Sequence, residues 1–166
     1  RFNEIYKSDF KKYQMAMTLI ATVRGIPQLY YGSEIGMKGD KGKGDADIRR
    51  DFPGGWNGDA NNAFTKEGRT AEQQKFFDFS SKLFTWRKSK EVMHSGKMTH
   101  YVPDNNVYVY FRYNEKETVM VIINNNSETV LKISNGQYNT DTHTATFDKS
   151  KIEKVLANDT NPPPVG

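Results

Sequence analysis

The stretch GIPQLYYG, residues 25–32, constrains the fold of this chain most, because it follows a helical pattern and precedes a long polar segment. A short apolar run bounded by glycine is typical of a buried strand in a parallel sheet that is covered on both faces. No second run of this kind occurs in the first half of the chain, and one strand cannot form a sheet. The strand is therefore expected to belong to a larger α/β domain, most of which lies outside this sequence.

Helical periodicity predicts two helices on either side of this region. The first begins near Ser8, as its N-cap, and ends before Gly25. The second begins at Thr70, whose hydroxyl is expected to form a capping box with the side chain of Gln73. Each helix carries an apolar stripe, which consists of Phe10, Tyr13, Met17 and Ile20 in the first and of Phe76, Phe79, Leu83 and Trp86 in the second.

After about residue 92 the hydrophobic period changes from 3.6 to 2, which indicates antiparallel strands. A turn sequence at residues 103–106 joins the first two of these strands into a hairpin. The proline-rich end at 161–166 cannot join a ladder. The expected strands lie at residues 97–102, 107–113, 118–124 and 129–133. Together they predict a small antiparallel β-sandwich.

Composition excludes several classes of function. The chain has no cysteine, so a disulfide scaffold and a thiolate metal site are excluded, while the compartment stays open with export favoured over the cytoplasm. The net charge is +4 without a block of like charge, which argues against a nucleic-acid partner. No apolar run reaches the ~20 residues that cross a bilayer. Residues 38–45 match neither a P-loop nor an EF-hand, and the histidines lack metal-ligand spacing.

The segment 33–69 shows no periodicity, and a loop of this length is usually either functional or disordered. Sites of α/β folds lie at the carboxyl ends of parallel strands, so this loop is a candidate site; a disordered surface insertion is the alternative. Acidic and basic side chains crowd at residues 45–50, ahead of Trp56. Carboxylate, guanidinium and an aromatic plane are groups that bind a sugar. A solvated charge cluster, with Trp56 anchoring the loop, is the competing interpretation.

Three stretches of the chain resemble the α-amylase family of glycoside hydrolases. GIPQLYYGSEIGM resembles the eighth barrel strand of that family, with its pattern G-x-P-x-x-Y-Y-G-x-E-x-G. IRRDFPGGWNGDANNAF is similar to the following loop in the neopullulanase and cyclomaltodextrinase branch, and LFTWRKS with GKMTHYVPDNNVYVYFRY is similar to the last barrel helix and the C-terminal β domain. The matching residues of the strand-eight pattern are Gly25, Pro27, Tyr30, Tyr31, Gly32, Glu34 and Gly36.

The resemblance implies an α/β plus all-β fold: the last part of a (β/α)8 TIM barrel and then a small C-terminal β-sandwich without the family's usual final strand. Residues 1–91 would be the barrel part, with a helix, strand eight, the long loop and the last helix, and residues 92–166 the β domain. The family's third catalytic carboxylate lies in an N-H-D motif often followed by Arg-Phe, so the chain is expected to begin just past it. All three catalytic carboxylates would then be absent from this chain.

The resemblance further implies that the parent enzyme cleaves α-glucosidic bonds of cyclodextrin, pullulan, starch or maltooligosaccharides by a retaining double displacement. The family places an Asp and an Arg four residues apart on this loop, where they hold a glucose, and Asp45 and Arg49 have that spacing. Arg50 is the alternative if the alignment shifts by one residue. Trp56 and Tyr31 are further candidates for stacking on the substrate or shaping its site.

No cofactor is expected, and a structural calcium would belong to the complete enzyme, since nothing in these residues indicates one. The expected partner is an α-glucan oligosaccharide, with no nucleic acid and no membrane, and a homodimer is compatible with the sequence. A non-catalytic carbohydrate-binding module is the alternative function. An interaction domain without a sugar ligand is the third.

Overall fold

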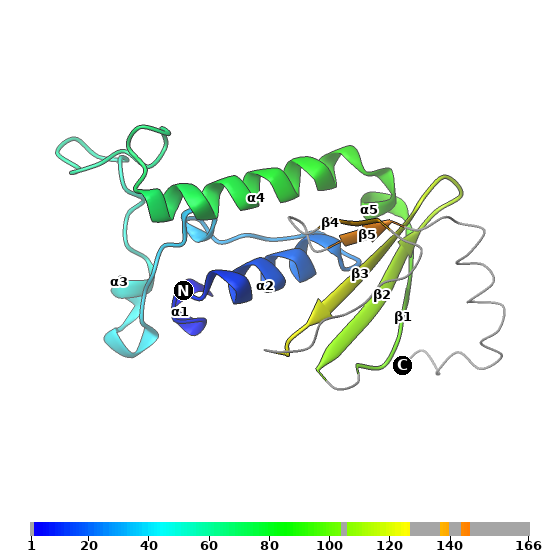
Figure 1. The fold of residues 1–166 in the computed structure, drawn as a ribbon. Coiled ribbons are helices and arrows are strands. Elements are labelled where there is room, and N and C mark those ends of the chain that lie inside the picture. Colours follow the sequence, from blue (N-terminus) through cyan, green and yellow to red (C-terminus); the bar gives the residue numbers. More distant parts are fainter. Residues whose placement is uncertain (1, 104–105, 127–136, 140–143, 147–166) are drawn as a thin grey trace. The chain divides into compact units, whose positions relative to one another are not determined.

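The computed structural model describes residues 2–103, 106–126, 137–139 and 144–146 (Figure 1). The chain forms two compact units. Unit 1 consists of residues 1–17 and 26–86, and unit 2 consists of residues 18–25 and 87–166. The domain boundary predicted after residue 91 refers to the domains of a complete protein, and it stays a prediction.

Helices supply the regular structure of unit 1. They are α1 (Phe2–Ile5), the first part of α2 (Phe10–Thr22), the short helices η1 (Ser33–Ile35), η2 (Lys41–Lys43) and α3 (Asp45–Ile48), and most of α4 (Ala71–Ser89). Helix α2 is capped by Asp9 and not by Ser8, because the Asp9 carboxylate accepts hydrogen bonds from the backbone N–H groups of Lys11 (2.9 Å) and Lys12 (3.3 Å). The predicted N-cap was thus wrong by one residue.

The core of unit 1 is aromatic. The Tyr13 ring meets the Phe76 ring edge to face, with 4.6 Å between centroids, and both side chains are fully buried. The Tyr13 hydroxyl shares a 2.7 Å hydrogen bond with Ser80 and donates at 2.8 Å to the carbonyl of Ser33. Burial raises the pKa of Tyr13 to about 12. Tyr13 and Met17 of the α2 stripe and Phe76, Phe79 and Leu83 of the α4 stripe therefore supply the core. The tyrosine hydroxyl connects this core to η1.

The capping box of α4 is confirmed. Gln73 N donates to Thr70 Oγ1 at 3.1 Å, and Thr70 N donates to Gln73 Oε1 at 2.9 Å. Both bonds satisfy backbone donors that a helix N-terminus leaves without a partner. The sequence pattern was sufficient here because every participant lies within four residues.

The predicted buried strand at residues 26–32 is not observed. No residue of this segment lies in a strand, and the Ile26 side chain is 95% exposed. A parallel strand needs neighbouring strands for its hydrogen-bond ladder and for the burial of its side chains. The described residues of unit 1 contain no strand that could pair with this segment, so the expected burial does not occur.

Unit 2 contains one antiparallel sheet. After α5 (Glu91–Ser95) follow β1 (Lys97–His100), β2 (Val107–Tyr113), β3 (Thr118–Asn124), β4 (Gln137–Asn139) and β5 (Thr144–Thr146), in the sheet order β1-β2-β3-β5-β4. The predicted hairpin is confirmed, since Lys97 pairs with Tyr113 and His100 with Tyr110. The described strands belong to this single sheet, so the predicted sandwich stays unconfirmed. The predicted strand at 129–133 and the end at 161–166 lie outside the described residues.

Two buried arginines organise unit 2 around the end of α2. Arg112, on β2, is 1% exposed, and its guanidinium donates to the carbonyls of Thr22 (3.0 Å), Val23, Val92, Met93 and Gly96. Arg87 donates to the carbonyls of Ala21 (2.6 Å) and Gly25 (3.2 Å). The last carbonyls of a helix lack intrahelical partners, so both cations act as C-terminal caps.

Candidate functional site

The long polar loop of unit 1 contains ordered short helices. Between residues 33 and 48 it forms η1, η2 and α3 in succession. Left-handed glycines flank η1, with φ of 79° at Gly32 and 69° at Gly36. Asp40 caps η2, because its carboxylate accepts a 2.8 Å bond from Gly42 N. The glycines and Asp of this loop therefore act as turn and capping residues.

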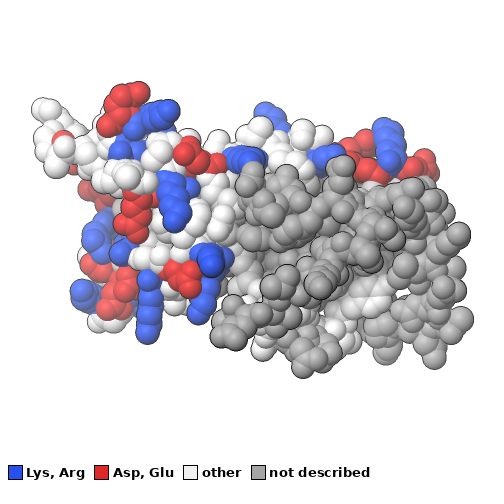
Figure 2. Space-filling model, in the orientation of Figure 1, with Lys and Arg blue, Asp and Glu red and all other residues white. Residues whose placement is uncertain are grey.

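The predicted sugar-binding pair lies on α3. Asp45 is its first residue and Arg49 its C-cap, and Arg49 Nη2 lies 3.2 Å from Asp45 Oδ2. The side chains are 49% and 66% exposed, respectively, and Asp45 also pairs with Lys41. Figure 2 shows that acidic and basic side chains are interspersed over the visible surface of unit 1. The structure thus brings the predicted pair together in an accessible position.

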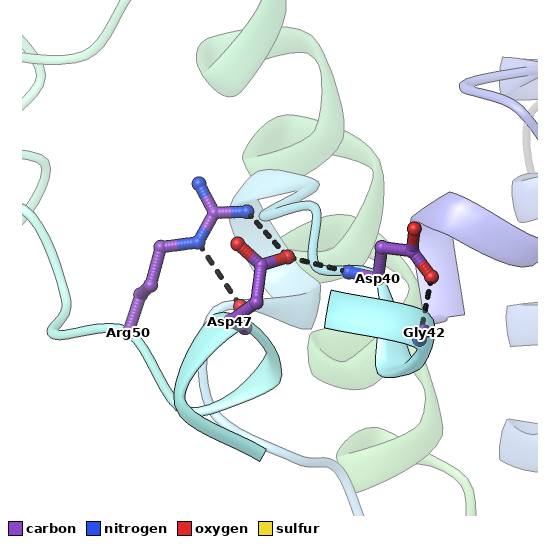
Figure 3. Close-up of polar contacts among 4 residues, drawn as sticks. All are labelled: Asp40, Gly42, Asp47 and Arg50. Carbon is purple, nitrogen blue, oxygen red and sulfur yellow. Dashed lines mark hydrogen bonds and ion pairs between the residues drawn. The ribbon is translucent and has the colours of Figure 1, made fainter. Parts of the chain in front are cut away.

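The carboxylate of Asp47 accepts hydrogen bonds from two other residues of the loop (Figure 3). Its Oδ2 accepts hydrogen bonds from Asp40 N at 2.7 Å and from Arg50 Nη2 at 3.1 Å. Arg50 Nε also donates to the carbonyl of Asp47 at 3.0 Å. These interactions, led by the Asp40 N–H bond, lower the pKa of Asp47. Asp47 therefore remains a carboxylate that joins η2 to the end of α3.

Tyr31 is tied to the same loop. Its hydroxyl donates to the carbonyl of Arg50 at 3.0 Å, and its ring lies 4.6 Å from that of Tyr30. About 40% of Tyr31 is exposed. The hydroxyl contact favours the shaping role over stacking, since it fixes residue 50 relative to residue 31.

Trp56 lies on a separate turn of the loop. The Asp59 carboxylate closes this turn by accepting hydrogen bonds from Gly54 N (2.7 Å) and Trp56 N (3.1 Å). Trp56 is 67% exposed, so its indole is presented to solvent. Phe64 is also 63% exposed and contacts the Phe52 ring, 4.5 Å between centroids. Sequence reasoning missed Phe64, although it ends the same run that contains Trp56.

Metal and membrane features were sought over the described parts of the chain. Among these residues no group of three or more His, Asp and Glu side chains could hold a metal ion. No helix there has the length and apolar character needed to span a membrane. His94 Nε2 lies 2.9 Å from the carbonyl of Arg87, and the ring of His100 meets that of Tyr108 edge to face. Each of these histidines has a structural contact in unit 2.

Comparison with known proteins identifies the family. The cyclo-maltodextrinase C-terminal domain family matches residues 98–160. Cyclomaltodextrin glucanotransferase of Bacillus licheniformis is 31% identical over 125 residues, which are 75% of this chain and 15% of that protein. Cyclomaltodextrinase of Thermoanaerobacter pseudethanolicus is 27% identical over 128 residues, 77% of this chain and 20% of that protein. The chain belongs to the α-amylase family.

A solved structure has a similar fold. The α-amylase of H. orenii superposes with a TM-score of 0.56 and 23% identity, over 85% of this chain and 34% of that protein. At this identity the similarity concerns the fold. The antiparallel sheet of unit 2 fits the family's C-terminal domain, since β1 to β5 lie largely within the matched residues. The matching family and the curated relatives confirm the predicted family membership, and the chain spans about a fifth or less of the relatives named here.

Proposed function

We propose that this chain supplies the eighth barrel strand, a substrate-binding loop and the C-terminal β domain of a retaining enzyme that cleaves α-glucosidic bonds in cyclodextrins or maltooligosaccharides. The named relatives are a cyclomaltodextrin glucanotransferase and a cyclomaltodextrinase, and this supports an α-glucan substrate. The nucleophile and the acid/base carboxylate are assigned to other segments of the enzyme. The chain alone is therefore expected to lack hydrolytic activity.

The observation that carries the proposal is the exposed Asp45–Arg49 pair. Carboxylate oxygens accept hydrogen bonds from sugar hydroxyls, and the guanidinium donates several in a planar fork. An exposed ion pair contributes only about 0.2–1 kcal/mol, so exchanging part of it for contacts with a glucose costs little. Its 3.2 Å geometry on one turn of α3 holds both groups within reach of neighbouring hydroxyls.

The exposed segment that begins at Ile26 supports the barrel assignment. Ile26 is 95% and Leu29 36% exposed, although both are apolar. Neighbouring strands of a complete barrel would bury such side chains and supply the ladder. The segment is thus expected to become strand eight in the complete enzyme, with Tyr31 at the start of the loop that carries the site.

The test is a pair of substitutions in the complete enzyme. Asp45→Ala with Arg49→Ala is expected to reduce kcat/KM for a long maltooligosaccharide about 100-fold, because two charged groups that contact a glucose are lost. The matched control is Glu91→Ala with Lys116→Ala, which removes another exposed ion pair, 3.1 Å long, from unit 2. Equal activity of the site variant and the control would contradict the proposed role of the pair.

Transfer of the glycosyl group to a sugar acceptor is a second candidate, since one relative is a glucanotransferase. Retaining enzymes form a glycosyl–enzyme intermediate, which water or another sugar hydroxyl can resolve. Product analysis with a cyclodextrin substrate separates the two: linear products of the original length indicate hydrolysis, and longer or recyclised products indicate transfer.

A further inference from the structure

The helix that carries the candidate sugar-binding pair is too short to hold its own position. Helix α3 contains four residues, and forming an isolated helical turn is unfavourable. The ion pairs of Asp45 are exposed and hence weak. The orientation of Asp45 and Arg49 must therefore depend on other contacts of this turn.

Asp47 provides these contacts from inside α3. Its carboxylate accepts from Asp40 N at 2.7 Å on one side and from Arg50 Nη2 at 3.1 Å on the other (Figure 3). The Asp47 side chain is 24% exposed, against 49% for Asp45, so it is the less accessible acid of the turn. The charge-assisted bonds of a carboxylate are about twice as strong as neutral ones. One side chain thus links α3 to the N-cap of η2 and to Arg50, the residue after the C-cap of α3.

Arg50 extends this network to the segment before the loop. Its Nε donates to the Asp47 carbonyl, and its own carbonyl accepts the Tyr31 hydroxyl at 3.0 Å. The guanidinium of Arg50 is directed at Asp47, whereas that of Arg49 contacts Asp45. The two adjacent arginines therefore have different ion-pair partners, and we assign sugar binding to Arg49.

We propose that Asp47 is a positioning residue that, with Arg50 and Tyr31, holds Asp45 and Arg49 in the orientation needed to bind a glucose. This inference rests on the proposed function and adds how the site is pre-organised. The pKa of Asp47 is lowered, as expected for a carboxylate that accepts these bonds. Misplacing a binding group by about 1 Å can cost up to 100-fold in rate.

The experiment is a double-mutant cycle in the complete enzyme with Asp47→Asn and Arg49→Ala. Asparagine keeps the shape of the side chain and removes the charge that Arg50 contacts. We expect Asp47→Asn to lower kcat/KM for a long maltooligosaccharide about 10-fold, mainly through KM, and less than 2-fold when Arg49 is already alanine. Asp78→Asn on α4, an exposed acid of the same unit, is the matched control and should leave activity unchanged.

Three outcomes would overturn the inference. An equal loss in both backgrounds would show that Asp47 acts independently of Arg49, and an Asp47→Asn enzyme with full activity would show that it does not position the pair. If the Arg49→Ala enzyme is inactive, Arg49→Lys takes its place in the cycle, because it is expected to keep a measurable activity. If Arg49→Ala alone changes nothing, the proposed sugar contact fails and this inference fails with it. If Arg49→Ala is impaired and Asp47→Asn is not, only the inference fails.

Discussion

Replacing Arg112 by methionine tests whether the guanidinium cap holds unit 2 together. The side chain is 1% exposed, and its two terminal nitrogens contact five carbonyls at 3.0–3.4 Å. Three of these belong to the end of α5 and its C-cap, Gly96, and two to Thr22 and Val23. No carboxylate is among these acceptors. Burial, with a smaller contribution from Arg87, lowers the pKa of Arg112, so the carbonyl bonds must offset the cost of desolvating the cation.

The magnitude follows from what methionine cannot replace. A hydrogen bond to a charged group contributes about 1.5–3 kcal/mol, and the five contacts share two nitrogens, so their energies do not add. Methionine fills much of the volume but leaves the carbonyls without their donor. We therefore expect Arg112→Met to reduce the free energy of unfolding by about 3–5 kcal/mol. For a unit of this size, that corresponds to a fall of more than about 10 °C in Tm.

Calorimetric unfolding of the protein and its variants measures this effect. Arg24→Met is the matched control, because Arg24 is exposed in the same unit and its charge acts on Arg112. That variant should change stability by less than about 0.5 kcal/mol. Arg112→Lys should be intermediate, since one ammonium cannot reproduce the planar fork. If Arg112→Met and Arg24→Met unfold at the same temperature, the carbonyl contacts do not stabilise unit 2 and the reasoning is wrong.

Two further substitutions test the core of unit 1. The pKa of Tyr13 is raised to about 12, so its contribution to stability is present below pH 10 and is lost as the pH rises through 12. Tyr13→Phe should therefore remove roughly 2–3 kcal/mol of the pH dependence of the unfolding free energy, measured by urea titration at each pH. Tyr110 also has a raised pKa, so only the difference between the two proteins reports on Tyr13, and parallel curves would refute the assignment. Gly36→Ala should cost about 2–4 kcal/mol in the same assay, since φ is +69° and the new Cβ would lie 2.9 Å from the Phe76 ring. Gly36→Asn tolerates that φ better, so full recovery of stability with asparagine would show that the collision is unimportant.

The features predicted correctly depend on short-range chemistry. The capping box at Thr70 and Gln73 and the alternation of residues 107–113 are complete within a few positions of the chain. The strand at residues 26–32 was predicted on the same local pattern, but a strand also needs a ladder from other segments. Its composition fits a buried environment, and the described residues do not supply one.

In the candidate site, as in the fold, some features could be predicted from the sequence and others could not. The Asp45–Arg49 pair could be recognised from the resemblance to the α-amylase family, which has an Asp and an Arg four residues apart on this loop. The short helix α3 that brings the two side chains together was not predicted. The role of Asp47 could not be recognised, since its partner Asp40 N is a backbone group and no residue type marks such an acceptor. For Tyr31 the sequence left stacking and shaping open, and the hydrogen bond from its hydroxyl to the carbonyl of Arg50 favours shaping.

The arginine caps hold the end of α2 directly before the segment that we assign to strand eight. Arg87 and Arg112 donate to the carbonyls of Ala21, Thr22, Val23 and Gly25, and Ile26 follows directly in the chain. Tyr31 then holds the loop at Arg50, only a few residues further along. In the proposed enzyme, strand eight would thus begin directly after a capped helix end and would end where Tyr31 holds the site loop. Neighbouring strands of that enzyme would have to supply the hydrogen-bond ladder of residues 26–32, which the described residues of this chain do not supply.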